Sequence, residues 1–234
     1  MKKEVIVALD FDSGKKAIEF LDGFKSAKPF VKIGMELFYS EGPQIVNTIK
    51  AKGHKVFLDL KIHDIPNTAR KAMKSLASLG VDMINVHAAG TAEMMRAAAD
   101  AFTGCTKKPL VIAVTQLTST DEKTMKEQLL IDCPMEQVVA KYALNAKTAG
   151  LAGVVCSPHE VPYVKRICGE DFVTVTPGVR FAGQDANDQK RVTTPAMAAS
   201  LGSDFIVMGR SITGAEHPEA AYIKAMNEFG GNNE

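Results

Sequence analysis

Residues 56–69 read Val56-Phe57-Leu58-Asp59-Leu60-Lys61-Ile62-His63-Asp64-Ile65-Pro66-Asn67-Thr68-Ala69. The run begins with apolar residues of high β-propensity, and Pro66 suits the first turn of a helix, so a strand, a turn and a helix are predicted in that order. Because side chains alternate along a strand, Asp59 and Lys61 share one face. Buried charges are costly unless they are paired. A structural ion pair is one interpretation; a catalytic group is the other, since α/β folds place their chemistry at the carboxyl ends of strands.

The composition is that of an ordinary globular protein of one domain. Of 234 residues, 46% are hydrophobic and 24% charged, and the net charge is +1. This balance predicts no broad basic surface for nucleic acid, so any anion site must be local. The four cysteines are too dispersed for a Cys-x-x-Cys metal site and favour a reduced, cytoplasmic protein. The apolar run after Lys2-Lys3 stops at Asp10, too early for a secretory signal, and no segment reaches the length of a membrane span.

Short apolar runs alternate with helical patterns along the whole chain. Strands are predicted at residues 5–9, 30–33, in the segment quoted above, and at 83–86, 110–114, 153–156, 172–175 and 205–208. Helices are predicted at residues 13–21, 43–52, 66–79, 91–102, 135–149, 158–168, 195–201 and 218–229, with a short helix inside 118–133. Eight strand–helix units predict a single-domain (β/α)₈ TIM barrel over residues 1–234, with its active site at the carboxyl ends of the strands. An open doubly wound sheet is the alternative, although no Gly-x-Gly-x-x-Gly follows the first strand.

Charged residues recur at the strand ends that such a barrel would bring together. Asp10 ends the first strand, Lys32 lies in the second, and Asp59 and Lys61 lie in the third. Alternating lysines and carboxylates can neutralise one another and still aim one ammonium at a substrate, so a functional cluster is predicted here. His87, at the end of the fourth strand, either extends this network or is a satisfied polar residue beside it.

A second group of residues follows the last two strands. Thr176-Pro177-Gly178-Val179-Arg180 comes after the seventh strand, and Val207-Met208-Gly209-Arg210-Ser211 after the eighth. Loops at these two positions are the recurrent phosphate site of the TIM barrel, where backbone N–H groups and arginines bind the anion. The polar segment 181–190 is either a solvated loop or a lid that closes over a phosphate.

The segment Asp59-x-Lys61-x-x-Asp64, followed by Ile65-Pro66-Asn67-Thr68, resembles the signature of the orotidine 5′-phosphate decarboxylase family. Metal-dependent sugar-phosphate decarboxylases and aldolases of the wider superfamily share only the Asp-x-Lys-x-x-Asp part, and they carry a carboxylate ligand for Mg²⁺ on the second strand. Here Lys32 places an ammonium at that position, which argues against a metal. The likeness extends over essentially the whole chain, with Leu117-Thr118-Ser119 resembling the family's pyrimidine-binding segment.

The resemblance implies cofactor-free decarboxylation of orotidine 5′-phosphate to UMP, the last step of de novo pyrimidine biosynthesis. It implies a catalytic set made of Lys61, Asp59, Asp64 and Lys32. It implies substrate contacts from Asp10, Lys32, Thr68, Thr118, Arg180, Gln189, Gly209 and Arg210. It also implies a homodimer in which Asp64 and Thr68 reach the partner's site. Two rivals remain: a Mg²⁺-dependent sugar-phosphate decarboxylase or aldolase, and a non-catalytic phosphometabolite-binding protein, for which the Asp59/Lys61/Asp64 set would be unnecessary.

Overall fold

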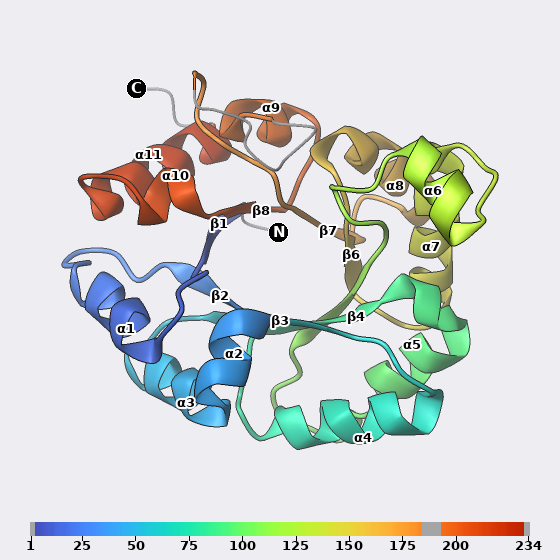
Figure 1. Ribbon diagram of the computed structural model, residues 1–234, viewed down its shortest axis with the longest axis horizontal. Helices are drawn as coiled ribbons and strands as arrows, with labels where there is room; N and C mark the ends of the chain where they lie inside the picture. Colours follow the sequence, from blue (N-terminus) through green and yellow to red (C-terminus); the bar gives the residue numbers. More distant parts are fainter. Residues whose placement is uncertain (1–2, 184–192, 232–234) are drawn as a thin grey trace.

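The computed structural model describes residues 3–183 and 193–231, and its centre is a closed ring of eight parallel strands in chain order (Figure 1). The strands are β1 Glu4–Ala8, β2 Phe30–Gly34, β3 Val56–Ile62, β4 Met83–His87, β5 Leu110–Val114, β6 Gly153–Val155, β7 Val173–Thr176 and β8 Phe205–Met208. The ring is closed because β1 pairs with both β2 and β8. The predicted (β/α)₈ barrel is therefore confirmed, and the open sheet is excluded.

Helices surround this ring, as Figure 1 shows. They are α1 Gly14–Asp22, α2 Met35–Glu41, α3 Pro43–Ala51, α4 Pro66–Ala77, α5 Thr91–Asp100, α6 Glu122–Leu129, α7 Met135–Thr148, α8 Val161–Cys168, α9 Pro195–Ser200, α10 Arg210–Thr213 and α11 Pro218–Gly230, with short 3₁₀ turns at Ala88–Gly90 and Pro158–Glu160. Sequence analysis did not predict α2 and α10. Both follow a strand directly and are short, so neither offers a window long enough to reveal a helical period.

The first amide of α1 is bound by a neighbouring helix. Ser13 occupies the N-cap position of α1, but its side chain makes no capping hydrogen bond. The backbone N–H of Gly14 instead donates to Glu41 Oε1, 2.7 Å away at the end of α2. A carboxylate from a neighbouring helix thus satisfies an amide that has no partner within its own helix.

The inside of the barrel is apolar in its lower part, and polar residues lie nearer the carboxyl ends of the strands. Ten buried residues from the strands form this inner core: Ile6, Ala8, Phe30, Phe57, Met83, Ile112, Val173, Val175, Phe205 and Val207. Two positions further along three adjacent strands, on the same face, the side chains are polar: Lys32 after Phe30, Asp59 after Phe57, and Asn85 after Met83. The alternation of strand side chains therefore carries polar groups up to the carboxyl end of the barrel.

Two aspartates bind neighbouring strands and helices at the opposite, amino-terminal end of the barrel. Asp82, just before β4, binds Lys50 and Lys107 and accepts the backbone N–H of Val56. Asp204, just before β8, lies 2.8 Å from Lys165 Nζ and accepts both the N–H and the hydroxyl of Thr174. Among residues 3–183 and 193–231, no helix combines the length and apolar character needed to span a bilayer.

Candidate active site

A continuous row of opposite charges lies at the carboxyl ends of the first three strands. Lys32 Nζ is 3.1 Å from Asp10 Oδ1 and 3.4 Å from Asp59 Oδ2. The other carboxylate oxygen of Asp59, Oδ1, is 2.8 Å from Lys61 Nζ. The structure thus brings together the four charged residues expected to converge, in the order Asp10, Lys32, Asp59, Lys61.

The opposite charges in the row stabilise one another in their ionised forms. Burial alone would raise the pKa of Asp59, but the positive charges of Lys32 and Lys61 and the hydrogen bonds from Lys61 and Asn85 outweigh it, so this pKa is lowered. Burial alone would lower the pKa of Lys32, but the charges of Asp59 and Asp10 outweigh it, so this pKa is raised. Lys32 is only 13% exposed, whereas Lys61 is 28% exposed. The inner lysine therefore neutralises the two carboxylates, and the outer lysine faces the open barrel mouth.

The backbone of β3 is irregular where these charges lie. Lys61 has a φ of 50°, in the left-handed region that residues with a Cβ rarely adopt, and the pairing of β3 with β4 shifts register between Leu58 and Ile62. Asn85 of β4 lies opposite this irregularity and is completely buried. Sequence analysis did not single out Asn85, although a polar residue at an inward position two residues after Met83 was the available signal.

Two cavities open at this end of the barrel, and the charged row lies where they meet. The larger, of about 730 Å³, is lined by Ala8, Asp10, Lys32, Pro177, Gly178, Val179, Arg180, Val207, Gly209, Arg210 and Ser211. The smaller, of about 300 Å³, is lined by Lys32, Phe57, Asp59, Lys61, Val114, Gln116, Leu117, Thr118, Ser119, Val155, Cys156, Pro177 and Val207. Because Lys32, Pro177 and Val207 line both, the two cavities form one continuous site.

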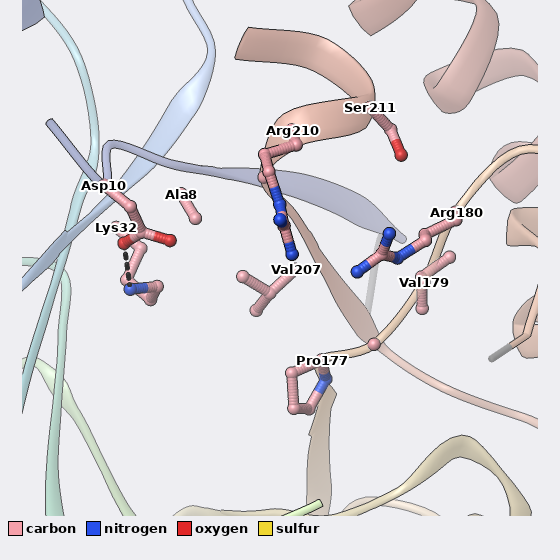
Figure 2. A pocket seen from close by; sticks show the side chains of 11 residues that line it. Ala8, Asp10, Lys32, Pro177, Val179, Arg180, Val207, Arg210 and Ser211 are labelled. Carbon is pink, nitrogen blue, oxygen red and sulfur yellow. Dashed lines mark hydrogen bonds and ion pairs between the residues drawn. The ribbon is translucent and has the colours of Figure 1, made fainter. Parts of the chain in front are cut away.

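The larger cavity is cationic on one side. Figure 2 shows Arg180 and Arg210 on one side of it, and Asp10 with Lys32 on the other. Arg180 follows β7, and its backbone N–H donates to Thr193 O at 3.0 Å, which links the segment after β7 to the segment just before α9. Gln189, expected to join this group, lies outside the described residues. Two arginines converging on one space suit a phosphate, which accepts several charge-assisted hydrogen bonds.

The smaller cavity combines apolar walls with polar groups. Thr118, expected at a pyrimidine, lines it, and so do Gln116 and Cys156, which sequence analysis did not assign to the site. Gln116 stands two residues before Thr118 in the same strand-end segment, so its position was a usable signal. Cys156 is the last residue of the sixth predicted strand, and nothing in the neighbouring sequence distinguished it as a site residue. Apolar walls with a few polar groups are typical of pockets that bind small organic molecules.

Asp64 and Thr68 lie apart from the other predicted site residues. Both are exposed, and neither lines either cavity. Asp64 Oδ1 accepts the backbone N–H of Ile65 at 2.7 Å. A single chain therefore does not bring these two residues to its own charged row.

His87, at the end of β4, makes its contacts with residues next to the charged row. Its Nδ1 accepts the backbone N–H of Ala89 at 3.2 Å, and its ring stacks on His63 at a centroid distance of 5.5 Å. Burial, followed by the positive potential of His63 and Lys61, lowers the pKa of His87, which keeps the accepting nitrogen free of a proton. Of the two roles open for His87, this geometry favours the structural one.

The family of the chain follows from comparison with known proteins. The family model described as "Orotidine 5'-phosphate decarboxylase / HUMPS family" matches residues 3–225. The chain belongs to this family. Orotidine 5′-phosphate decarboxylase of Bacillus cytotoxicus is 54% identical, with 99% of both chains covered, and that of Bacillus mycoides is 53% identical over the same share.

Solved structures of relatives have the same fold. That of orotidine 5′-phosphate decarboxylase from Lactobacillus acidophilus superposes with a TM-score of 0.87 at 40% identity, covering 97% of this chain and 99% of the other. An uncharacterized conserved protein from Geobacillus kaustophilus gives 0.85 at 48% identity, covering 96% and 99%. Within the described ranges, no three His, Cys, Asp or Glu side chains are grouped so as to hold a metal ion.

Proposed function

We propose that this protein decarboxylates orotidine 5′-phosphate to UMP, the last step of de novo pyrimidine biosynthesis, with no metal or cofactor. The observation that carries the proposal is the position of Lys61: its ammonium lies 2.8 Å from Asp59 in a cavity that also contains Thr118. Membership of the family and relatives of that name at 53–54% identity support it.

The shape of the site suits a nucleoside monophosphate. The phosphate would occupy the larger cavity, where Arg180, Arg210 and the backbone at Gly209 surround it. The pyrimidine would occupy the smaller cavity beside Thr118. Since Lys32 lines both cavities and is ion-paired with Asp10, the ribose would lie beside this pair, and its hydroxyls can bond to both charged groups.

The chemistry follows from the position of the outer ammonium. Breaking the bond between C6 of the pyrimidine and its carboxylate releases CO₂ and leaves the electron pair on C6. An ammonium fixed against that carbon stabilises the developing charge and then donates its proton, which completes UMP. Lys61 has this role in our proposal; the neutral amine it leaves regains a proton from water.

Asp59 and Lys32 would hold this ammonium in place. Asp59 binds Lys61 through one carboxylate oxygen and Lys32 through the other, so neither lysine can move without losing an ion pair. Asp59 would also lie near the departing carboxylate. Because the preorganised charges are present before substrate binds, little reorganisation is needed during the reaction.

An assay of UMP formation with and without a chelator tests the proposed function against its rivals. We expect turnover of orotidine 5′-phosphate that does not change in excess EDTA, because the row Asp10–Lys32–Asp59–Lys61 is already neutralised without a cation. Activity lost with EDTA and restored by Mg²⁺ would favour the metal-dependent branch. Tight binding of UMP without any turnover would favour a binding protein.

Replacement of Arg210 should impair binding and catalysis together. We expect Arg210→Ala to lower kcat/KM for orotidine 5′-phosphate by about 10²-fold, because each charge-assisted hydrogen bond to phosphate contributes roughly 1.5–3 kcal/mol. Phosphate binding also helps to close and order the site, so kcat should fall too. Steady-state kinetics measure both parameters.

The control for this variant is a substrate without phosphate. Orotidine should be processed almost equally by Arg210→Ala and by the wild type, and Arg166→Ala, which removes a 67% exposed arginine from α8, should affect neither substrate. An equal loss on orotidine and on its phosphate would contradict a phosphate-binding role for Arg210.

We also propose a homodimer whose two sites are shared. Asp64 and Thr68 are exposed and line neither cavity of their own chain, which supports a role in the partner's site. Large apolar side chains are exposed as well: Ile65, next to Asp64 in the sequence, is 67% exposed, and Tyr39, in α2, is 70% exposed. Covering such residues by a second copy would bury apolar surface in the usual way of a two-fold dimer.

The proposed setting is the cytoplasm, with a small-molecule substrate and no nucleic acid or membrane as partner. Cys105, Cys133, Cys156 and Cys168 are all free thiols, as expected in a reducing compartment. The near-zero net charge of the chain gives no general attraction to nucleic acid or to an anionic membrane surface.

A further inference from the structure

The ladder between β3 and β4 is interrupted at the charged row. Leu58 pairs with Ile84, and the next pair is Ile62 with Val86. Residues 59–61 of β3 therefore face only Asn85 of β4. Extra residues on one strand remove it from regular pairing and re-aim its side chains, and they leave backbone groups that need other partners.

The side chain of Asn85 supplies the missing partners. Its Oδ1 accepts the backbone N–H of Lys61 at 2.8 Å, and its Nδ2 donates to Asp59 Oδ1 at 2.6 Å. Asn85 is completely buried, on the inward face directly above Met83. One rigid amide thus fixes the backbone that carries the outer ammonium and the carboxylate that binds it.

The conformation of Lys61 explains why this support is needed. With a φ of 50°, its backbone is in a region that a residue with a Cβ occupies only when its surroundings hold it. The hydrogen bond from its N–H to Asn85 is such a constraint. Without it, the strand could relax, and the Lys61 side chain would no longer be held in the smaller cavity.

We propose that Asn85 is a positioning residue for decarboxylation, whose amide fixes the Lys61 backbone and the Asp59 carboxylate at the spacing the reaction requires. The proposal rests on the proposed function. It assigns no contact with substrate to Asn85. A side chain with a merely structural role would affect stability, whereas a positioning residue must affect turnover in the folded protein.

The first test replaces Asn85 with leucine, which has a similar shape and no hydrogen-bonding group. We expect kcat to fall by about 10²-fold or more, because a misplacement on the order of 1 Å costs about that much. The dissociation constant for UMP, measured by calorimetry, should change less than about threefold, since the arginines of the larger cavity are untouched.

Thr174→Val is the matched control. It also replaces a buried hydrogen-bonding side chain by an apolar one of similar shape, but it does so at the amino-terminal end of the barrel, where Thr174 binds Asp204. Its kcat should equal that of the wild type even if its Tm falls. If Asn85→Leu likewise keeps wild-type kcat in the folded protein, the proposal is overturned.

The second test is Asn85→Asp, which converts the amide into a group that can mimic it only when protonated. The protonated acid can donate to Asp59 and accept from Lys61, as the amide does; the ionised form repels Asp59. In this variant two carboxyl groups lie side by side and share a proton. Because Lys32 and Lys61 keep Asp59 ionised, the proton resides on the introduced aspartate. Its burial beside a negative charge favours the protonated form at low pH.

The activity of Asn85→Asp relative to the wild type should therefore fall as pH rises. Between pH 5.5 and 8.5 we expect a fall of at least about tenfold, the change that one pH unit produces beyond the pKa of a single group. Asn85→Leu, which cannot titrate, should keep a constant ratio. If the ratio for Asn85→Asp is independent of pH, the proposal is overturned, and this holds even if Asn85→Leu fails to fold.

Amide hydrogen exchange at Lys61 gives a readout that does not depend on activity. By NMR, the Lys61 N–H should be protected in the wild type and should exchange at least about tenfold faster in Asn85→Leu, because its acceptor is gone. Unchanged protection would overturn the role of Asn85. A wild-type protein that forms no UMP would instead refute the proposed function, while the exchange rates would still decide whether Asn85 holds the Lys61 backbone.

Discussion

Replacing Lys61 with alanine is expected to lower kcat for orotidine 5′-phosphate by at least about 10⁴-fold, because one side chain supplies both charge stabilisation and the proton. Each of these contributions is commonly worth on the order of 10²–10³-fold. The fold should survive, since Asp59 keeps its contacts with Lys32 and Asn85 when Lys61 is removed. Steady-state kinetics and circular dichroism of the same preparation measure the two effects.

Lys126→Ala provides the matched control. It removes a lysine that also forms an ion pair with an aspartate, Asp132, but lies 63% exposed in α6. Its turnover should equal that of the wild type. If Lys61→Ala kept a tenth of the wild-type kcat, another residue would have to perform the chemistry, and the proposed mechanism would be wrong.

Mixing two inactive variants should restore activity if the active sites are shared between subunits. Lys61→Ala and Asp64→Ala proteins are each expected to be nearly inactive. In a mixed dimer, one site receives Lys61 from one chain and Asp64 from the other and is intact, while the second site carries both defects. Random exchange makes about half of the dimers mixed, so about a quarter of all sites should recover by two-fold symmetry.

The control for this experiment pairs two residues that act within one chain. Asp59 and Lys61 of the same chain lie 2.8 Å apart, so mixing Asp59→Ala with Lys61→Ala cannot assemble an intact row. No activity should return in that mixture. If exchange is demonstrated by differently tagged subunits and the Lys61→Ala with Asp64→Ala mixture also stays inactive, Asp64 acts in its own chain and the shared site is refuted.

Local patterns in the sequence were enough to predict the barrel and the charged row. Eight apolar runs separated by helical patterns indicate a parallel arrangement, because parallel strands need crossover connections, which are usually helices. The spacing of two residues from Phe30 to Lys32 and from Phe57 to Asp59 places each charge on the same face as a core residue. Both inferences depend on periods of a few residues, which the chain displays directly.

The residue that holds the charged row in place could be identified only from the tertiary structure. The break in pairing between β3 and β4 depends on hydrogen bonds between residues far apart in the chain, and no local pattern encodes its register. Asn85 therefore looks, in sequence, like one polar residue in an apolar strand, and its two bonds to Asp59 and Lys61 become visible only when the strands lie side by side.

The union of the two cavities is also a tertiary property. Pro177 follows β7 and Val207 lies in β8, yet both line the two cavities together with Lys32 of β2, because the closed ring pairs β8 with β1. The motif at residues 59–68 placed Asp64 in the catalytic set of the partner's site, and the folded chain leaves it exposed and outside both cavities of its own barrel. Sequence determined which groups are present; the closure and register of the barrel determined which of them can meet.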